Sequence, residues 1–404
     1  MPVQQESSKI ERVEAEPASA PTRITTVGSP ADWFHLYFPR RPFEERLDVL
    51  LVGEAYHRAR ALAYGNTDCR FVVVHDVADV LDCLEELKAR EGIENIDVML
   101  GDLKEIEVLE TRFDLVFFDC SVAQASDLDR WLGAIWNVLR SEGSLHLKVP
   151  GRYGWHGISL LRRLGAALEI PTGAEGRDAA QELVAAVTDS NRGSTDESEA
   201  AAVAIDRRLL DRITQPEEAA FTVDEVLAVL EGSGYRLQRL LYQAPYLPDA
   251  CGLAADSQLC GDALALPPRE QWALVELFRG SMGSHEMIAC RSDRVASSFE
   301  VDLDGEDWLS YVPVLSPLLE TEFDDLLPGT AMRVRCRGHL YPEIKVLLDA
   351  TQAALCRSID GSRSAGDLVA LVDSEKADEA VSYVQNLLIS LWRYDYIWFQ
   401  TQPQ

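Results

Sequence analysis

The sequence predicts an open α/β fold, in which a mainly parallel sheet carries helices on both faces. The first observation is the short apolar run LDVLLVGEAYH (residues 47–57), which ends in a glycine and is typical of a central, covered strand followed by a tight turn. The second is that four more strand-like runs follow with room for one helix between them: RFVVVHD (70–76), IDVMLGD (96–102), FDLVFFD (113–119) and GSLHLKVP (143–150). This alternation predicts a ligand crevice at the carboxyl ends of the strands.

The composition is that of a folded chain with room for two or three domains. Of its 404 residues, 47% are apolar. No run approaches the roughly 18 apolar residues of a membrane span, and residues 1–21 lack the apolar core of a signal peptide, so we expect a cytoplasmic protein without membrane contacts. The net charge of -29 would repel a phosphate backbone, which argues against nucleic acid as a partner. The eight cysteines form no C-x-x-C pair and no cluster with histidine, so neither a zinc site nor a disulfide framework is expected.

An aromatic and basic segment, ADWFHLYFPRRPFEER, stands just ahead of the first strand. Residues 1–28 before it are rich in Glu, Ser, Pro and Ala and are predicted to be a disordered tail. The aromatic side chains have two interpretations: they pack a leading helix onto the sheet, which is the commoner use of aromatic area, or they close over a ligand as a lid. They are Trp33, Phe34, Tyr37 and Phe38.

Polar residues stand at the ends of the predicted strands, where ligands bind in such sheets. Gly53 ends the first strand, and Gly65 stops the helix that follows. Asp76 ends the second strand, where a carboxylate can accept hydrogen bonds from both hydroxyls of a ribose; an Asp that caps the next helix is an equally good interpretation. Asp102 follows the third strand, where it could read an adenine edge, and Asp119 ends the fourth.

The order and spacing of these elements resemble the class I S-adenosylmethionine (SAM) dependent methyltransferases. The resemblance is carried by RFDLVFFD, LDRWLGAIWNVLRSEGSLHLKVPGRYG, AFTVDEVLAVLEGSGYRLQRLLYQAPYLP and LPPREQWALVELFRGSMGSHEMIACR. Over about residues 30–404 the chain is similar to bacterial methyltransferase-domain proteins with a C-terminal winged-helix-like module. The resemblance implies a Rossmann-like, seven-stranded sheet that ends in an antiparallel pair, residues 235–242 and 284–291, with SAM as cofactor and a small molecule, protein or peptide as acceptor.

Members of this family carry a G-x-G-x-G loop after the first strand, which lets the backbone approach the methionine part of the cofactor. Here the loop reads Gly53-Glu54-Ala55-Tyr56-His57, so only the first glycine is kept. A glycine lost where φ must be positive costs on the order of 1 kcal/mol, and His57 adds bulk. The helix that opens at His57 and Arg58 could instead hold the methionine carboxylate with its amides and a positive side chain. The residues that the resemblance assigns to the cofactor are Gly53, Ala55, His57, Asp76, Asp102 and Asp119.

Methyl transfer from a sulfonium needs mainly alignment in a dry pocket, and a base only when the nucleophile arrives protonated. Polar candidates after the fourth and fifth strands are Asp119, Ser121, Lys148, Tyr153 and His156, of which Asp119, Tyr153 and His156 are the predicted catalytic residues. A packed, hydrogen-bonded histidine is the alternative interpretation of His156.

Three other functions are alternatives to an active methyltransferase. The degenerate glycine loop leaves a pseudo-methyltransferase, serving as a binding or regulatory subunit, as the main alternative. The absence of an N/D-P-P-Y/F element after the fourth strand argues against a methylase of nucleic-acid bases or glutamine. A nicotinamide oxidoreductase would need a glycine fingerprint that the sequence lacks.

Beyond the fifth strand the sequence predicts an insertion and a second domain. The insertion, residues 157–220, is expected to shape the acceptor pocket unless it only decorates the surface, and the methyltransferase-like domain spans 29–295. Residues 296–404 are predicted to form an α+β, winged-helix-like domain. Its helices carry more acidic than basic residues, so we expect contacts with a partner protein or a second copy of the chain rather than with DNA. Its predicted elements are helices at 349–359, 364–373 and 376–393 and a strand at 396–400.

Overall fold

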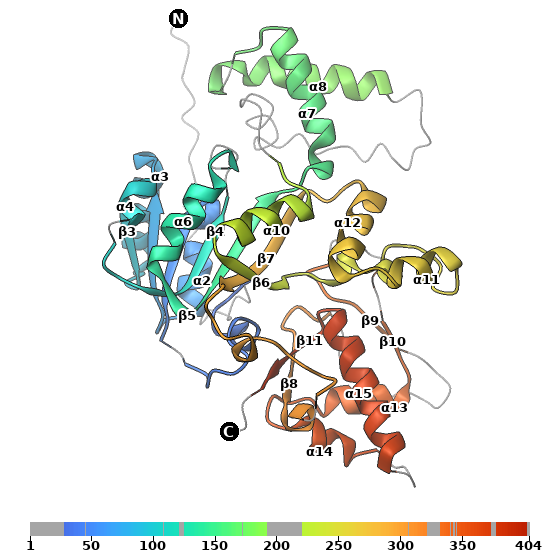
Figure 1. Cartoon of the computed structure of the whole chain (residues 1–404). Coiled ribbons are helices and arrows are strands. Elements are labelled where there is room, and N and C mark those ends of the chain that lie inside the picture. Colours follow the sequence, from blue (N-terminus) through green and yellow to red (C-terminus); the bar gives the residue numbers. More distant parts are fainter. Residues whose placement is uncertain are drawn as a thin grey trace, which may run out of the picture.

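A seven-stranded sheet runs through the molecule, with helices on both faces (Figure 1). The computed structural model describes residues 28–44, 46–107, 109–120, 125–171, 173–191, 220–305, 307–320, 332–339, 341, 344, 346–372 and 377–401. The strand order is β3-β2-β1-β4-β5-β7-β6, in which β7 runs antiparallel to both of its neighbours, β5 and β6. The strands are β1 (Asp48–Gly53), β2 (Arg70–His75), β3 (Ile96–Leu100), β4 (Phe113–Asp119), β5 (Leu139–Pro150), β6 (Tyr235–Leu240) and β7 (Ser284–Arg291). The predicted sheet, including its antiparallel edge, is confirmed.

The apolar runs form the centre of the sheet because both of its faces are covered. β4 is buried at every position, and β1 at all but its first. Alternate residues of β1 face opposite layers: Leu51 packs with one helix layer and Leu50 with the other. The first layer contains α1 (Phe34–Tyr37), α2 (Ala59–Gly65) and α3 (Ala78–Glu91); the second contains α4 (Leu103–Glu107), α6 (Leu128–Val138), α10 (Val223–Gly232) and α12 (Pro268–Arg279).

Two local predictions need correction. The stretch DLDRWLGAIWNVLR (residues 127–140) predicts a helix, and the glycine after it predicts a turn into the fifth strand. This turn is absent, because α6 ends at Val138 and β5 begins at once at Leu139. Residues 140–143 of β5 form a bulge, because Phe113 of β4 pairs with Leu139 while Leu115, two residues later, pairs with Ser144. The helix expected directly after Gly53 also starts differently, as a 3-10 turn, η1 (Glu54–Arg58), that leads into α2.

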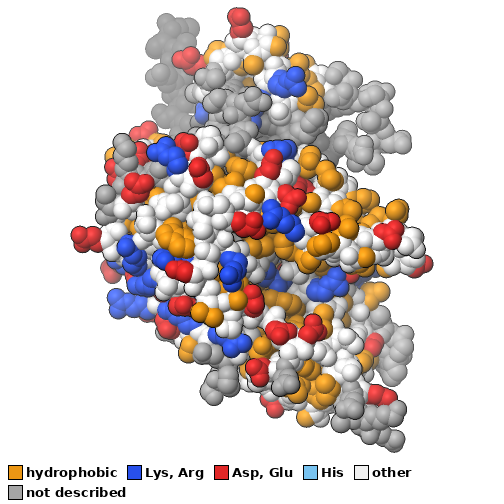
Figure 2. Space-filling model, viewed as in Figure 1, with side chains coloured by type: hydrophobic (Ala, Val, Ile, Leu, Met, Phe, Trp, Pro, Cys, Tyr) orange, Lys and Arg blue, Asp and Glu red, His pale blue; other side chains and the backbone are white. Residues whose placement is uncertain are grey.

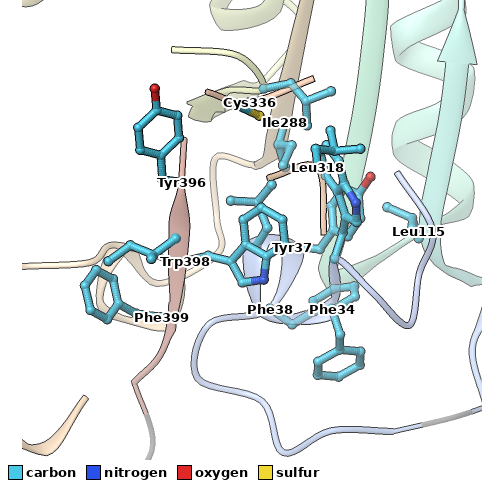
Figure 3. Packing of buried hydrophobic residues seen from close by; sticks show 14 of the residues in the cluster. Phe34, Tyr37, Phe38, Leu115, Ile288, Leu318, Cys336, Tyr396, Trp398 and Phe399 are labelled. Atoms are coloured by element: carbon cyan, nitrogen blue, oxygen red, sulfur yellow. The ribbon is translucent and has the colours of Figure 1, made fainter. Parts of the chain in front are cut away.

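The leading aromatic segment packs against the sheet, so the lid interpretation is wrong. Trp33, Phe34, Tyr37 and Phe38 are each at most 1% exposed. Figure 3 shows Phe34, Tyr37 and Phe38 between the sheet and the C-terminal strand, in one apolar cluster with Trp398. Gly28, the last residue assigned to the tail, is already buried against Phe117 and His146; residues 1–27 lie outside the described part.

The C-terminal unit, residues 296–401 where described, shares its core with one face of the sheet. Its elements are η6 (Ala296–Ser298), η7 (Asp307–Ser310), β8 (Val312–Leu315), β9 (Met332–Val334), β10 (Val346–Leu348), α13 (Ala350–Arg357), α14 (Ala365–Val369), α15 (Ala377–Arg393) and β11 (Ile397–Gln400). β11 pairs with β8, and β10 with β9, both antiparallel. The helices predicted at 349–359, 364–373 and 376–393 and the strand predicted at 396–400 are confirmed as α13, α14, α15 and β11. Ser364, which the sequence predicts as a cap, accepts from the backbone N–H of Asp367 at the start of α14. The winged-helix assignment stays a prediction.

The part of the chain between β5 and α10 stands away from the sheet (Figure 1). It contains η2 (Tyr153–Trp155), α7 (His156–Ala167), η3 (Gly173–Gly176) and α8 (Arg177–Asn191); residues 192–219 lie outside the described part. The helices that the sequence predicts at GISLLRRLGAALEI (157–170) and AAQELVAAV (179–187) are thereby confirmed. Between β6 and β7 lie η4 (Ala244–Tyr246), η5 (Pro248–Ala250) and α11 (Gln258–Leu264). Figure 2 shows an apolar area over α11 and α12, where Leu259, Leu277 and Phe278 are exposed. Among the described helices, none is long and apolar enough to cross a membrane.

The joint core predicts that Trp398 supports the whole chain rather than the C-terminal unit alone. Its ring centroid lies 5.3 Å from that of Trp33. We expect Trp398→Ala to lower the free energy of unfolding by about 3–5 kcal/mol, as large-to-small core changes do. Urea unfolding measures this, with the exposed Leu347→Ala as control. A loss confined to the C-terminal unit, with the sheet unfolding as in the wild type, would contradict the shared core.

Candidate active site

Four residues stand side by side across the carboxyl edge of the sheet. Gly53 of β1 is in register with Asp119 of β4, Asp119 with Lys148 of β5, and Lys148 with Glu286 of β7. Residues in register on neighbouring strands, about 4.8 Å apart, project to the same face of the sheet. The three charged side chains therefore lie in one row at the edge where ligands of this fold bind.

Arg58, from the 3-10 turn after β1, joins two carboxylates of this row. Its Nε donates to Oδ2 of Asp119 at 3.0 Å, and its Nη2 donates to Oε1 of Glu286 at 2.9 Å. All three side chains are at most 14% exposed. Burial opposes the charge of Arg58, but the charges of Glu286 and Asp119 outweigh it and raise its pKa, so the guanidinium stays charged.

Behind Glu286 lies a buried histidine and tyrosine pair. Nε2 of His146 lies 2.7 Å from Oε1 of Glu286, and Nδ1 lies 2.8 Å from the hydroxyl of Tyr37. Burial lowers the pKa of His146 and raises that of Tyr37 well above its usual value, so we assign a neutral ring whose Nε2–H donates to Glu286 and whose Nδ1 accepts from Tyr37. Burial alone would raise the pKa of Glu286, but the His146 hydrogen bond and the Arg58 charge hold it below its usual range.

In each of these two carboxylates, Asp119 and Glu286, one oxygen has no hydrogen bond to a described residue. Oδ1 of Asp119 is buried without a hydrogen-bond partner. Both hydrogen bonds of Glu286 within the described residues go to Oε1, and Glu286 lines a cavity, so Oε2 is the oxygen that a ligand in the cavity can reach. A buried acceptor without a donor is costly, which makes Oδ1 of Asp119 a candidate contact for a ligand.

The cavity has a volume of about 530 Å³ and lies between the sheet edge and the C-terminal unit. It is lined by Arg58, Lys148, Tyr242, Pro245, Tyr246, residues 281–284, Glu286, Arg337, Gly338 and Tyr341. Three of these are tyrosines, whose rings suit an apolar or cationic ligand. A volume of this size holds a small molecule or the side chain of a larger one.

The structure revises the prediction for the glycine loop. Gly53 has φ 65° and ψ −140°, a conformation that favours glycine, and is the loop glycine that the sequence keeps. Ala55 and His57 lie inside the 3-10 turn with negative φ, so the strain expected from their lost glycines is absent. Ala55 is fully buried, whereas the side chain of His57 is 53% exposed and pairs with Glu54 at 3.2 Å.

The remaining predicted cofactor residues lie along the same edge. His75 is in register with Leu100, and the amide of Gly101 donates to the carbonyl of His75, which brings Asp76 and Asp102 to neighbouring strand ends. The side chain of Asp76 is 64% exposed. Their roles toward a cofactor stay predictions.

The predicted catalytic residues are placed unequally. Asp119 is in the charged row, paired with Arg58. Tyr153 lies half-buried in η2, after the end of β5, and His156 begins α7, but the side chain of His156 and all of Ser121 lie outside the described residues. The assignment of Tyr153 and His156 to catalysis stays a prediction.

Sequence reasoning missed His146 and Glu286 and gave Arg58 only a secondary part. The available signal was a charged or polar residue inside an otherwise apolar strand, His146 in GSLHLKVP and Glu286 in SHEMIACR. Such residues are seldom buried unless they are paired. The pattern could have indicated a buried polar network, although not its partners.

Comparisons with known proteins agree with the sheet order. A sequence model of the family described as "Methyltransferase domain" matches residues 51–147. A structure of PKMT2 from Rickettsia typhi in complex with AdoHcy is similar at a TM-score of 0.65 and 12% identity, over 92% of this chain and 75% of that chain. A second structure of PKMT2 gives 0.65 and 11%, over 92% and 76%. At this identity the likeness shows the fold, which is that of the class I SAM-dependent methyltransferases.

The buried neutral histidine predicts a loss of stability in mild acid. An unfolded histidine takes up a proton near pH 6.5, while the pKa of His146 is lowered, so stability is fully present above that pH and falls below it. We expect a slope of up to about 1.4 kcal/mol per pH unit from this group. His146→Gln should reduce the slope measured by urea unfolding between about pH 7 and pH 5; the exposed His57→Gln is the control. An unchanged slope in His146→Gln would show that the pKa of His146 is not lowered in the folded state.

Proposed function

We propose that this chain, in which residues 51–147 form a methyltransferase domain, transfers a methyl group from SAM to an amine nitrogen held in the cavity beside Glu286. The observation that carries the proposal is the place of Glu286 in the cavity lining, where Arg58 and His146 hold Oε1 and leave Oε2 for a ligand. The amine is carried by a small molecule, a peptide or a protein.

The residues at the sheet edge fit the cofactor. Gly53 allows the backbone to approach the methionine part, and the unpaired Oδ1 of Asp119 beside it suits the positively charged α-amino group. Asp76 would accept from the ribose hydroxyls, and Asp102 would face the adenine. When bound, SAM supplies a methyl group on a positively charged sulfur. Asp119, next in register to Gly53 and Lys148, stands between the cofactor residues and the cavity.

The acceptor side fits a nitrogen nucleophile better than an oxygen. An alkylamine arrives mainly as the ammonium ion and releases one proton to water before the displacement; the neutral amine then needs no base in the displacement itself, and its product carries the positive charge. Glu286 can accept a hydrogen bond from the amine and offset the product's charge, and the rings of Tyr242, Tyr246 and Tyr341 favour a cation. A hydroxyl acceptor would need a strong base, but the depressed pKa of Glu286 makes it a weak one.

The alternative is a pseudo-methyltransferase that binds ligands at the same edge without turnover. The observation that favours it is that Arg58 already engages Asp119 and Glu286. The two functions differ in one measurement, the release of demethylated cofactor in the presence of an amine.

We expect Asp76→Ala to weaken SAM binding without unfolding the protein. The loss of hydrogen bonds to a charged group costs about 1.5–3 kcal/mol, which raises the dissociation constant about ten- to 150-fold. Calorimetry on the full chain measures this for SAM and for its demethylated product AdoHcy. Asp97→Ala, an exposed carboxylate that pairs with Arg70 on the neighbouring strand, is the control and should bind as the wild type does. Equal affinities in both variants would remove Asp76 from the cofactor site.

We expect Glu286→Gln to weaken amine binding and to leave cofactor binding intact. Benzylamine is a probe with a cationic group and an aromatic arm, and benzyl alcohol is its neutral counterpart. With AdoHcy bound, benzylamine should bind the variant about ten- to 150-fold more weakly, and benzyl alcohol should bind both forms equally. The control is Glu142→Gln, whose side chain is 61% exposed. If the alcohol is preferred over the amine in the wild type, the nitrogen acceptor is wrong.

A further inference from the structure

The cavity beside Glu286 has two walls that come from distant parts of the chain. The β6 wall, residues 242–246, follows β6 and contributes Tyr242, Pro245 and Tyr246. The C-terminal wall, residues 337–339 with Tyr341, contributes Arg337, Gly338 and Tyr341. The cavity therefore exists only where the C-terminal unit meets the methyltransferase sheet.

One carboxylate oxygen joins these two walls. Oδ2 of Asp395, which lies in the turn between α15 and β11, accepts from the backbone N–H of Ala244 at 2.9 Å and lies 3.2 Å from Nε2 of His339. Ala244 belongs to the β6 wall and His339 to the C-terminal wall. Movement of Asp395 would therefore change both walls at once.

Asp395 is itself firmly held. Its Oδ1 accepts from Nη2 of Arg239 at 2.7 Å, and the same nitrogen donates to the carbonyl of Trp392, whose ring lies 3.6 Å below the guanidinium. Asp395 is 6% exposed and has φ 60°, a left-handed conformation that few residues other than glycine, asparagine and aspartate adopt. Burial opposes its charge, but the His339 hydrogen bond and the Arg239 charge keep its pKa below the usual value.

The two walls also touch directly. A side chain on Gly338 would place its Cβ 2.3 Å from the ring of Tyr242, so only glycine permits this approach. Arg279 of α12 stacks over Tyr341 at 3.8 Å and donates to the carbonyl of Pro245 at 2.8 Å. The separation of the two walls is thus set by close contacts, with Asp395 as the charged group that binds both.

We propose that Asp395 is a positioning residue that sets the distance between the two cavity walls, and that the C-terminal unit thereby selects the acceptor. The inference rests on the proposed function. The ligand class that the walls favour is an amine with an aromatic or apolar arm, because Tyr242 and Tyr341 line the cavity from the two walls and Glu286 lines it at the sheet edge. Asp395 does not touch the reacting atoms.

The test compares three variants of the full chain: Asp395→Asn, His339→Gln and Asp249→Asn. His339→Gln removes only the C-terminal contact of Asp395 and keeps the Arg239 pair, so it stays informative if Asp395→Asn fails to fold. Asp249→Asn is the matched control, because Asp249 pairs with Arg393 at 3.1 Å and so joins the same two units without lining the cavity. The readouts are AdoHcy affinity and benzylamine affinity with AdoHcy bound, both by calorimetry.

We expect Asp395→Asn and His339→Gln to weaken benzylamine binding at least about tenfold, to leave AdoHcy affinity within about twofold, and Asp249→Asn to change neither. The inference is overturned if the first two variants bind benzylamine as the wild type does, or if Asp249→Asn weakens it equally, since the effect would then come from general loosening. It is also overturned if the wild type binds AdoHcy but not benzylamine. Failure of the wild type to bind AdoHcy contradicts the proposed function instead.

Discussion

The guanidinium of Arg58, held between Asp119 and Glu286, is the interaction on which the arrangement of the sheet edge depends. Two carboxylates at most 12% exposed cannot remain charged at one edge without a counterion, because desolvation of an ion costs several kcal/mol. Arg58 reaches both only because Gly53 turns the chain with positive φ into a tight 3-10 turn. Removal of the cation would leave uncompensated buried charge, which typically costs about 3–5 kcal/mol.

The same interaction links the two halves of the site. Asp119 is in register with Gly53 on the proposed cofactor side, and Glu286 lines the cavity on the proposed acceptor side. The chain of contacts continues from Glu286 through His146 to Tyr37 in the leading helix. A carboxylate fixed in this way needs no rearrangement when a ligand arrives, which is the condition under which a charge contributes most to binding and catalysis.

The fold could be predicted from the sequence because its strands and helix caps depend on neighbouring residues. The apolar run of β4 and the pattern TVDE (residues 222–225), which predicts a capping box, both depend on neighbouring residues only, and both predictions are confirmed. The site was only partly predictable, since Arg58 and Glu286 stand 228 positions apart. No local pattern shows that strands from such distant segments become neighbours. The prediction placed His57 in the site, but the 3-10 turn exposes His57 and directs Arg58 inward.

The proposed cofactor site and the proposed acceptor cavity differ in the same way, because the first is built from nearby segments of the chain and the second from distant ones. The proposed cofactor residues stand at the ends of β1, β2, β3 and β4, elements that a single stretch of about 70 residues supplies and whose geometry follows from the strands themselves. The proposed acceptor cavity is instead lined by residues of β5, β7, the segment after β6 and the C-terminal unit. Substitutions in the C-terminal wall can therefore alter which acceptor fits while the cofactor edge keeps its strand register. Under the proposed function, the C-terminal unit, which shares the core of the sheet, would influence which acceptor binds without taking part in the chemistry.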